Sequence, residues 1–164
     1  MSRILIIGGS DAGISGGLRA REVDPSSAVT LLVGDRFPNY SICGLPFLIS
    51  GEAPDWHELA HRSREDLGSA GLELLLETAA TAIDPSARSV TMEGPSGTSE
   101  LSYDRLVIAT GARPIESSVR GHDLPGVHLL HTNGLSVHSR LRVFETCPKA
   151  QSEPPSNPAR FGRA

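Results

Sequence analysis

The chain has 164 residues, and 38 % of them are hydrophobic, which suits one globular domain and excludes a chain that is disordered or fibrous over most of its length. Its formal net charge of -4 provides no basic field that would attract nucleic acid or an anionic membrane surface. No apolar run approaches the roughly 20 residues of a membrane span, and the first apolar run is too short for a signal peptide, so we expect a cytoplasmic protein.

The first elements in chain order are a strand, a helix and a second strand. Ile4–Ile7 is a continuous apolar run that ends at two glycines, which is typical of a strand buried on both faces of a parallel sheet. A helix is expected over about 12–22, because apolar residues recur there four positions apart, and it should stop before Asp24-Pro25. Val29–Val33 is a second apolar strand, so this part of the chain predicts a βαβ unit.

The middle of the chain predicts one more helix and then a series of short strands. Ser63 is a suitable N-cap for a helix over Ser63–Ala70, and Gly71 is a suitable stop. Turn residues separate the runs that follow, as in a small β-meander that leads into a last apolar strand. These strands are expected over Leu74–Ile83, Ser89–Met92, Glu100–Ser102 and Arg105–Ala109.

A change in composition near Gly134 divides the chain into two parts. Residues 135–164 contain five basic and two acidic side chains, four prolines and no apolar periodicity after Phe144. Such a segment does not bury enough apolar surface to form a core of its own. We therefore expect one domain over residues 1–134 and a Pro-rich, disordered tail over residues 135–164.

The turn after the first strand carries a candidate dinucleotide-binding motif. It reads GGSDAG over Gly8–Gly13, a near match to G-x-G-x-x-G in the required place between a strand and a helix. Gly8 permits the tight turn, Gly13 permits close packing of the helix on the strand, and the helix N-terminus offers N–H groups to a pyrophosphate. Ser10 replaces the middle glycine, and the acid nearest the expected ribose position is Asp35. The motif favours nucleotide binding over a purely structural turn.

Cys43 is the candidate redox residue. The chain has two cysteines, Cys43 and Cys147, which excludes a disulfide scaffold and leaves room for a functional thiol. Pro46 suits the first turn of a helix and Gly51 its end, so Cys43 should lie at or just before a helix N-terminus, where the dipole stabilises a thiolate. A buried, inert cysteine is the alternative. Cys147, in the tail, should behave as an ordinary exposed thiol.

The segment His57–His61 reads HELAH and satisfies the H-E-x-x-H pattern, in which two histidines one helical turn apart bind zinc. Leu67 stands where a third metzincin ligand would fall, and the segment between Pro54 and Ser63 is short for a helix that must hold a metal. We expect an exposed, polar connecting helix and no metal site, with a zinc metallohydrolase as the less favoured alternative. The other histidines show no ligand spacing and are expected on the surface: His122, His128, His131 and His138.

Three segments, in the same order, resemble the N-terminal FAD-binding part of the pyridine nucleotide-disulfide oxidoreductases. They are the turn at Gly8–Gly13, the CGLP element at Cys43–Pro46 and the run YDRLVIATGARP at Tyr103–Pro114. The likeness covers about Ser2 to Gly134, and it is to the single-cysteine branch, which includes coenzyme A-disulfide reductases, NADH oxidases and NADH peroxidases. It implies a three-layer α/β domain of the Rossmann-like, FAD/NAD(P)-binding kind, with a β-meander. This domain would be incomplete in the present chain.

The resemblance also implies a function and a set of site residues. Cys43 would be catalytic and would cycle between a thiolate and an oxidised form, with electrons from FAD and NAD(P)H as the donor. The substrate would be a small disulfide or persulfide, of the coenzyme A type in some members. Cofactor contacts are implied at Gly8, Gly9, Ser10, Ala12, Gly13, Asp35, Arg36, Ala80, Ala109, Thr110, Gly111 and Arg113. Substrate contacts are implied at Ser15, Arg19, Asn39 and Ile42.

Three positions depart from the family pattern. Asp11 stands where the oxidases and peroxidases carry a histidine, which favours disulfide or persulfide reduction over peroxide chemistry. Glu22 replaces a basic residue, and Ile42 replaces an asparagine, of the coenzyme A-disulfide reductases. A phosphate-bearing substrate therefore does not follow from the resemblance.

The later parts of the family pattern do not occur in this sequence. A second nucleotide fingerprint, for NAD(P)H, is expected soon after Leu129, followed by a second flavin-contacting segment and the domain through which the family forms homodimers. We therefore expect a truncated or frame-disrupted product of a longer gene. A nucleotide-binding module without catalysis is the alternative from a different functional class.

Overall fold

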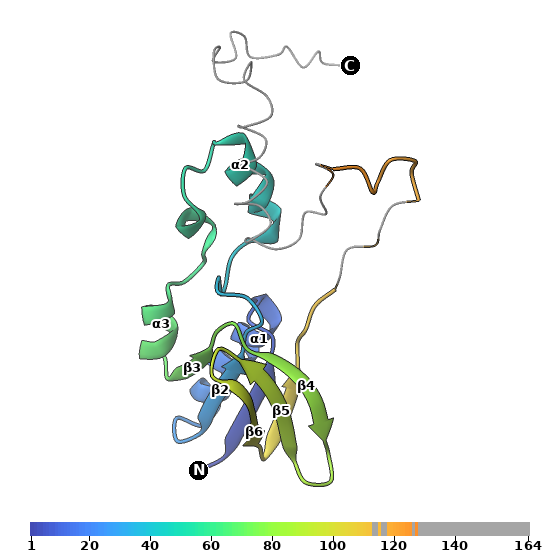
Figure 1. Cartoon of the computed structure of the whole chain (residues 1–164). Helices are drawn as coiled ribbons and strands as arrows, with labels where there is room; N and C mark the ends of the chain where they lie inside the picture. The colour runs from blue at the N-terminus through green and yellow to red at the C-terminus, as the bar shows by residue number, and fades with distance from the viewer. Residues whose placement is uncertain (113–114, 116–117, 126, 128–164) are drawn as a thin grey trace, which may run out of the picture.

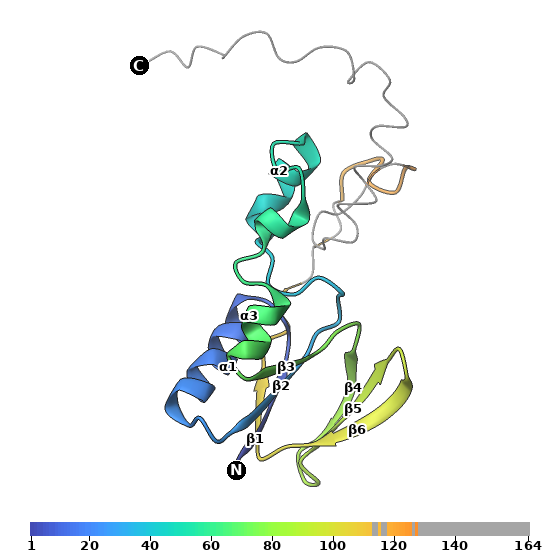
Figure 2. The ribbon, with the colours of Figure 1, turned by 90° about the vertical axis from the view of Figure 1, so that its left-hand side faces the viewer.

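The computed structural model describes residues 1–112, 115, 118–125 and 127. Its elements form three layers: two helices lie on one face of a parallel sheet, and a small antiparallel sheet lies against the other face (Figure 1, Figure 2). This arrangement confirms the predicted three-layer α/β fold. The predicted tail, Arg113 and Cys147 lie outside the described residues.

A four-stranded parallel sheet forms the middle layer. Its order is β3-β2-β1-β7, and each neighbouring pair is parallel. Its strands are β1 (Arg3–Ile7), β2 (Ala28–Leu32), β3 (Leu72–Leu75) and β7 (Arg105–Ile108). The predicted strands at 4–7, 29–33 and 105–109 are confirmed to within one residue at each end.

Strand β7 lies at an edge of this sheet, and no described strand pairs with its outer side. Its side chains Val107 and Ile108 are 37 % and 63 % exposed. A continuous apolar run is usual for a strand covered on both faces. The exposure of β7 follows from its place in the strand order, which a local apolar pattern does not reveal.

Helix α1 (Asp11–Val23) crosses from β1 to β2 and confirms the helix predicted over 12–22. It buries Ile14 and Gly17 against the sheet and ends at Val23, with Asp24 as its C-cap immediately before Pro25. None of the helices in the described ranges is long and apolar enough to cross a membrane.

Helix α3 (Arg64–Ser69) lies beside β3 and confirms the helix predicted over 63–70. The hydroxyl of Ser63 accepts a hydrogen bond from the Asp66 N–H, and the Asp66 carboxylate accepts one from the Ser63 N–H, each at 3.0 Å. This capping box holds the first turn, because it satisfies two N–H groups that the helix leaves open. Gly71 follows with a φ of 83° and ends the helix as predicted.

Each face of the parallel sheet has its own core. The core beneath the two helices contains Ile6, Ile14, Val29, Leu31, Val33, Leu67, Leu72 and Leu74. The core beneath the antiparallel sheet contains Leu5, Ile7, Leu32, Val90, Met92 and Tyr103. Alternate residues of β1 enter opposite cores, as the period of two in a strand requires.

The antiparallel sheet is the predicted meander, with a correction to its first strand. Its strands are β4 (Ala79–Asp84), β5 (Ser89–Gly94) and β6 (Gly97–Ser102), in the order β4-β5-β6. The single strand predicted over Leu74–Ile83 is wrong, because β3 ends at Leu75 in the parallel sheet and β4 begins at Ala79 in the antiparallel one. Glu77 lies between them with a φ of 51°, so the chain changes direction there.

Between β2 and α3 the chain extends beyond the carboxyl ends of the strands and then returns (Figure 1). This excursion contains the 3₁₀-helix η1 (Ile42–Gly44), the helix α2 (Leu45–Ser50) and the 3₁₀-helix η2 (Trp56–Leu59). It has a small core of its own, formed by Leu45, Leu48, Ala53 and Leu59. The excursion therefore packs as a unit of its own. Two chain segments at its base connect it to the main domain.

Candidate functional site

The glycine turn between β1 and α1 is so tight that two of its glycines have no room for a side chain. A Cβ atom on Gly13 would lie under 3.0 Å from the carbonyl oxygen of Gly8, a separation that real Cβ atoms essentially never show. A Cβ atom on Gly8 would meet the carbonyl group of Ala109 just as closely, and Gly8 has a φ of 126°. These contacts explain the first and last glycine of the motif physically.

The turn lies at the carboxyl ends of the strands. The N–H of Gly8 donates to the carbonyl of Leu32 at 2.9 Å, and a Cβ atom on Gly9 would lie 2.6 Å from the methyl carbons of Val33. β1 has β2 on one side and β7 on the other, so the strand order reverses beside β1. Ligands of doubly wound α/β folds bind outside the carboxyl ends of the strands at such a switch point.

Ser10 takes the place of the middle glycine and is the N-cap of α1. Its side chain is exposed and makes no capping hydrogen bond, so it does not occupy the N–H groups of the first helical turn. The first backbone hydrogen bond of the helix runs from the Ile14 N–H to the Ser10 carbonyl at 3.0 Å. Ala12 is exposed in the first turn, and the N–H groups before Ile14 have no partner within the helix.

Asp35 and Arg36 follow β2 in a short loop. The Asp35 carboxylate accepts a hydrogen bond from the Phe37 N–H at 3.2 Å, and the Asp35 carbonyl accepts one from the Glu77 N–H. The Arg36 guanidinium lies over the ring of Phe37, 4.8 Å from its centroid. Asp35 is half-buried and Arg36 is exposed, and contact of either with a ribose stays a prediction.

The run Ala109-Thr110-Gly111 continues from β7 to the glycine turn. The N–H of Ala109 donates to the Ile7 carbonyl at 2.8 Å, and the Ala109 carbonyl is the group that Gly8 faces. Thr110 and Gly111 are exposed. Ala80, which the resemblance places near the cofactor, lies in β4 and pairs with Met92.

Cys43 is exposed in η1, immediately before α2. Pro46 lies in the first turn of that helix, and Gly51 ends it with a φ of 85°. The predicted position of the thiol before a helix N-terminus is therefore confirmed, and the alternative of a buried cysteine is wrong, whereas the redox role of the thiol stays a prediction. The exposed sulfur is accessible to a soluble disulfide.

Asn39 is buried in the loop that precedes Cys43. It is 3 % exposed, has a φ of 60°, and donates from Nδ2 to the Arg62 carbonyl at 3.1 Å. Its N–H donates to the Gly9 carbonyl at 3.0 Å. Asn39 is therefore an internal link between the glycine turn and the returning chain, and its implied contact with substrate stays a prediction.

The other three implied substrate contacts are exposed: Ser15, Arg19 and Ile42. Ser15 and Arg19 lie four residues apart on α1, so they share a face of the helix. The Arg19 guanidinium donates to the Glu22 carboxylate at 2.6 Å. The one basic group of this face is thus paired with a carboxylate of the same helix.

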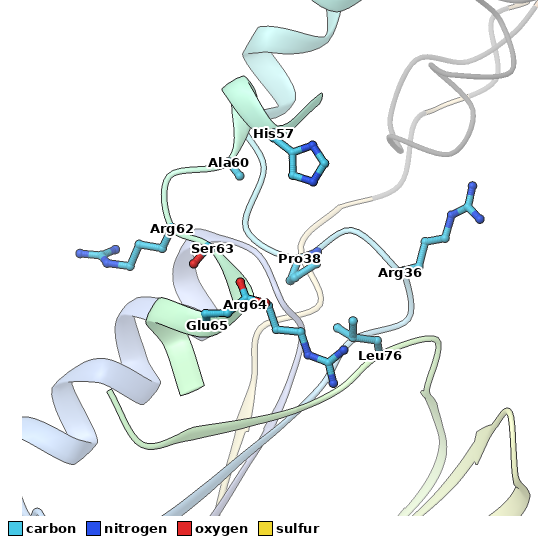
Figure 3. A pocket seen from close by; sticks show the side chains of 9 residues that line it. All are labelled: Arg36, Pro38, His57, Ala60, Arg62, Ser63, Arg64, Glu65 and Leu76. Carbon is cyan, nitrogen blue, oxygen red and sulfur yellow. The ribbon is translucent and has the colours of Figure 1, made fainter. Parts of the chain in front are cut away.

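A cavity of about 330 Å³ lies beside the loop that follows β2 (Figure 3). Its lining residues are Arg36, Pro38, His57, Ala60, Arg62, Ser63, Arg64, Glu65 and Leu76. Figure 3 shows Arg64 directed toward Leu76, whereas Arg36 and Arg62 point away in different directions. Three cationic side chains therefore border the cavity without converging on one point.

The HELAH segment does not form the α-helix that the zinc pattern requires. The helix η2 is a 3₁₀-helix that ends at Leu59, and Ala60 has extended backbone angles, so His61 lies outside it. The Nδ1 atom of His57 lies 2.6 Å from Asp55. Among the described residues no group of three or more potential ligands could hold a metal ion. The predicted connecting helix is present, and the zinc metallohydrolase is unsupported.

Residues 2–153 match the model of the pyridine nucleotide-disulphide oxidoreductase family, so the chain belongs to that family. Homologues and structural neighbours in this family depend on FAD and NAD(P)H. The match extends past Gly134, where the composition of the chain changes.

Three similar proteins illustrate the range of the family. An NADH oxidase of Lactococcus lactis is 30 % identical over 129 residues, which cover 78 % of this chain and 29 % of that protein. The probable ferredoxin reductase CtmF of Castellaniella defragrans is 33 % identical over 130 residues, 79 % of this chain and 31 % of that protein. The structure of an NAD-dependent persulfide reductase from A. fulgidus has a TM-score of 0.79 at 29 % identity and covers 88 % of this chain and 27 % of that one. This chain thus spans less than a third of the length of each relative.

Two features of the site were not predicted from the sequence. One is the left-handed backbone of Asn39, for which the only signal is that asparagine tolerates this conformation better than most residues. The other is the contact between Gly44 and Leu59, where a Cβ atom on Gly44 would lie 2.6 Å from Leu59 Cδ2. No local pattern predicts that contact, because the two residues meet only when the excursion folds back.

Proposed function

We propose that residues 1–134 form the FAD-binding part of an NAD(P)H-dependent oxidoreductase that reduces a small disulfide or persulfide through Cys43. The observation that carries this proposal is the meeting of separate chain segments at the carboxyl ends of β1 and β7. There the turn at Gly8–Gly13 touches the strand end at Ala109, and Asn39 bonds the same turn four residues before the exposed Cys43.

The glycine turn is suited to the pyrophosphate of FAD. Because Gly8 and Gly13 carry no Cβ atoms, backbone N–H groups can approach the phosphates, and the N-terminus of α1 favours negative charge there. Asp35 would accept a hydrogen bond from a ribose hydroxyl, and the exposed Thr110 and Gly111 would contact the flavin end. When bound, FAD would supply the two electrons that return an oxidised Cys43 to a thiolate.

The exposed Cys43 thiol provides the chemistry toward the substrate. Its thiolate attacks one sulfur of a disulfide, a new S–S bond forms between Cys43 and that sulfur, and the original S–S bond breaks. The second sulfur leaves as a thiolate and takes a proton from water. With a persulfide, attack on the outer sulfur transfers that sulfur to Cys43 and releases the remaining thiolate.

Two residues of α1 support this substrate class. Asp11 replaces the histidine expected of oxidases and peroxidases, and the structure places it in the first turn of the helix. Arg19 is paired with Glu22, so the helix face offers little net positive charge to a phosphate-bearing carrier. The likeness to a persulfide reductase agrees with a small sulfur substrate.

A pair of glycine variants tests the cofactor site. Gly13→Ala places a Cβ atom against the Gly8 carbonyl, whereas a Cβ atom on Gly16, one turn further along α1, meets nothing within 4 Å. Titration with FAD, followed by quenching of flavin fluorescence, should show binding by the parent chain and by Gly16→Ala. Gly13→Ala should bind at least about tenfold more weakly, because the phosphate-facing N–H groups are displaced. Equal affinity of all three proteins would contradict the cofactor site.

A second candidate is electron transfer to a ferredoxin, which the 33 % identity to a probable ferredoxin reductase supports. Cys43→Ser separates the two functions. If Cys43 is the redox group, the variant should retain FAD binding and lose the mixed disulfide that the parent forms at residue 43 with a small disulfide such as oxidised glutathione, with peptide mapping to separate this site from Cys147. If FAD binds but the parent chain forms no mixed disulfide at Cys43, electron transfer without a thiol, or a nucleotide-binding module without catalysis, becomes the better interpretation.

A further inference from the structure

Asn39 connects three parts of the structure through its own polar groups. Its N–H donates to the Gly9 carbonyl at 3.0 Å, its carbonyl accepts from the His61 N–H at 3.0 Å, and its Nδ2 donates to the Arg62 carbonyl at 3.1 Å. All three bonds lie in a nearly dry environment, because the residue is 3 % exposed. Loss of one partner would leave a buried polar group unsatisfied.

The HELAH segment, which does not form an α-helix in this fold, pairs with residues next to Asn39. Tyr40 and Ala60 form an antiparallel bridge, and the Ser41 N–H donates to the Leu59 carbonyl at 2.8 Å. We define the clamp as residues 39–41 together with 59–62. Leu59 also packs against Gly44, the residue after Cys43, where a Cβ atom would lie 2.6 Å from Leu59 Cδ2. The clamp therefore contacts the chain both before Cys43, at residues 39–41, and after it, at Gly44.

The geometry of Asn39 explains why this residue type occupies the position. A φ of 60° is costly for most side chains, and asparagine and glycine adopt it most readily. Glycine lacks the amide that reaches Arg62, and aspartate has an oxygen in place of Nδ2, which would face the Arg62 carbonyl as a second acceptor. Asparagine satisfies the backbone and the hydrogen bond together.

We infer that Asn39 is a positioning residue: through the clamp it holds the Cys43 segment in a fixed place relative to the glycine turn. The inference rests on the proposed function, because the position of Cys43 relative to the turn matters only if a cofactor binds at the turn and Cys43 reacts beside it. It assigns to the HELAH segment a structural role, which is to hold the segment that contains Cys43 in place. No contact of Asn39 with substrate is involved.

The test measures the alkylation rate of Cys43 by iodoacetamide in the full chain, with peptide mapping to separate Cys43 from Cys147. The variants are Asn39→Asp and Asn39→Gly, which both tolerate the left-handed backbone and both lose the amide donor. Glu58→Gln is the matched control, because Glu58 lies in the same segment and is exposed. Each protein is measured without FAD and with saturating FAD.

In the flavin-free chain, both Asn39 variants should change the Cys43 alkylation rate by about 2- to 10-fold, the range that one lost hydrogen bond produces. The ratio of rates without and with FAD should move toward one by a similar factor, while the FAD affinity stays within about threefold of the parent. Glu58→Gln should match the parent in every measurement. An unchanged Cys43 rate in both Asn39 variants, or the same change in Glu58→Gln, would overturn the inference.

This design separates failure of the inference from failure of the proposed function. If the parent chain does not bind FAD, the proposed function fails, and the inference is decided by the flavin-free rates alone. If FAD binds equally to all proteins and the rates do not differ, the inference fails and the cofactor site stands. If Asn39→Asp does not fold, Asn39→Gly, which introduces no second acceptor at Arg62, provides the same comparison.

Discussion

Gly13 lies against the carbonyl oxygen of Gly8 so closely that a Cβ atom on Gly13 would overlap it. This contact fixes the start of α1 directly over the end of β1. It accounts for a glycine at a buried helical position, where glycine is otherwise unfavourable by about 1 kcal/mol relative to alanine. The unfavourable helix propensity of glycine is tolerated at this position because the close approach of the Gly8 carbonyl leaves no room for any other residue.

The same contact predicts opposite stability effects for two glycines of one helix. Gly13→Ala should destabilise the chain by about 1–3 kcal/mol, because the new methyl group forces backbone movement in a packed region. Gly16→Ala should be neutral or stabilise by up to about 1 kcal/mol, because its Cβ atom enters open space and alanine favours the helix. Urea denaturation followed by far-UV circular dichroism measures both. Equal midpoints for the two variants would disprove the packing argument.

Asp104 predicts a loss of stability in acid. The hydrogen bond from the Arg3 N–H, and then the Arg3 guanidinium, hold the pKa of Asp104 below its ordinary value. Because the folded-state pKa is lowered, this contribution is present above the unfolded pKa near 3.8 and is lost as pH falls through the folded pKa. The melting temperature of Asp104→Asn should therefore fall less than that of the parent between pH 5 and about pH 2. A parallel decline of the two proteins would remove Asp104 from the acid response.

The parts of the fold that follow local periodicity could be predicted from the sequence. The βαβ unit was predicted because its strands are continuous apolar runs and its helix has a clear stop before Pro25. The capping role of Ser63 was predicted because serine is a favoured N-cap residue, and the structure adds a capping box with Asp66. In these places a few neighbouring residues determine the conformation.

The parts that depend on distant partners could not be predicted in this way. The chain between β3 and β4 reads as one strand, because the left-handed turn at Glu77 has no glycine to mark it. The burial of Asn39 could not be predicted from its neighbours, because it arises from residues that follow it by more than twenty positions. The contact between Gly8 and Ala109 likewise joins segments a hundred residues apart, and no local pattern indicates it.

Cys43 should react with a thiol reagent in the native state. Its side chain is exposed in η1, so Ellman's reagent should modify it without denaturant. Leu48, in the adjoining helix, is buried in the small core of the excursion, so Leu48→Ala should unfold this unit locally and raise the Cys43 rate further. Peptide mapping after partial modification identifies the thiol. Protection of Cys43 until the chain is denatured would contradict the exposed position.

The last prediction concerns the ion pair on α1 and the substrate class. Arg19 and Glu22 are both 69 % exposed, and such a pair is worth about 0.2–1 kcal/mol. Glu22→Gln frees the Arg19 guanidinium, so binding of coenzyme A to the full chain should strengthen by up to about fivefold at low salt, the factor that 1 kcal/mol represents. The gain should disappear at high salt, because exposed charges are screened. Isothermal titration of the parent, Glu22→Gln and Arg19→Gln with coenzyme A measures the effect, and the double variant should show none of the gain. A gain in the double variant as large as in Glu22→Gln alone would mean that Glu22 repels the phosphates directly and that Arg19 does not select the substrate.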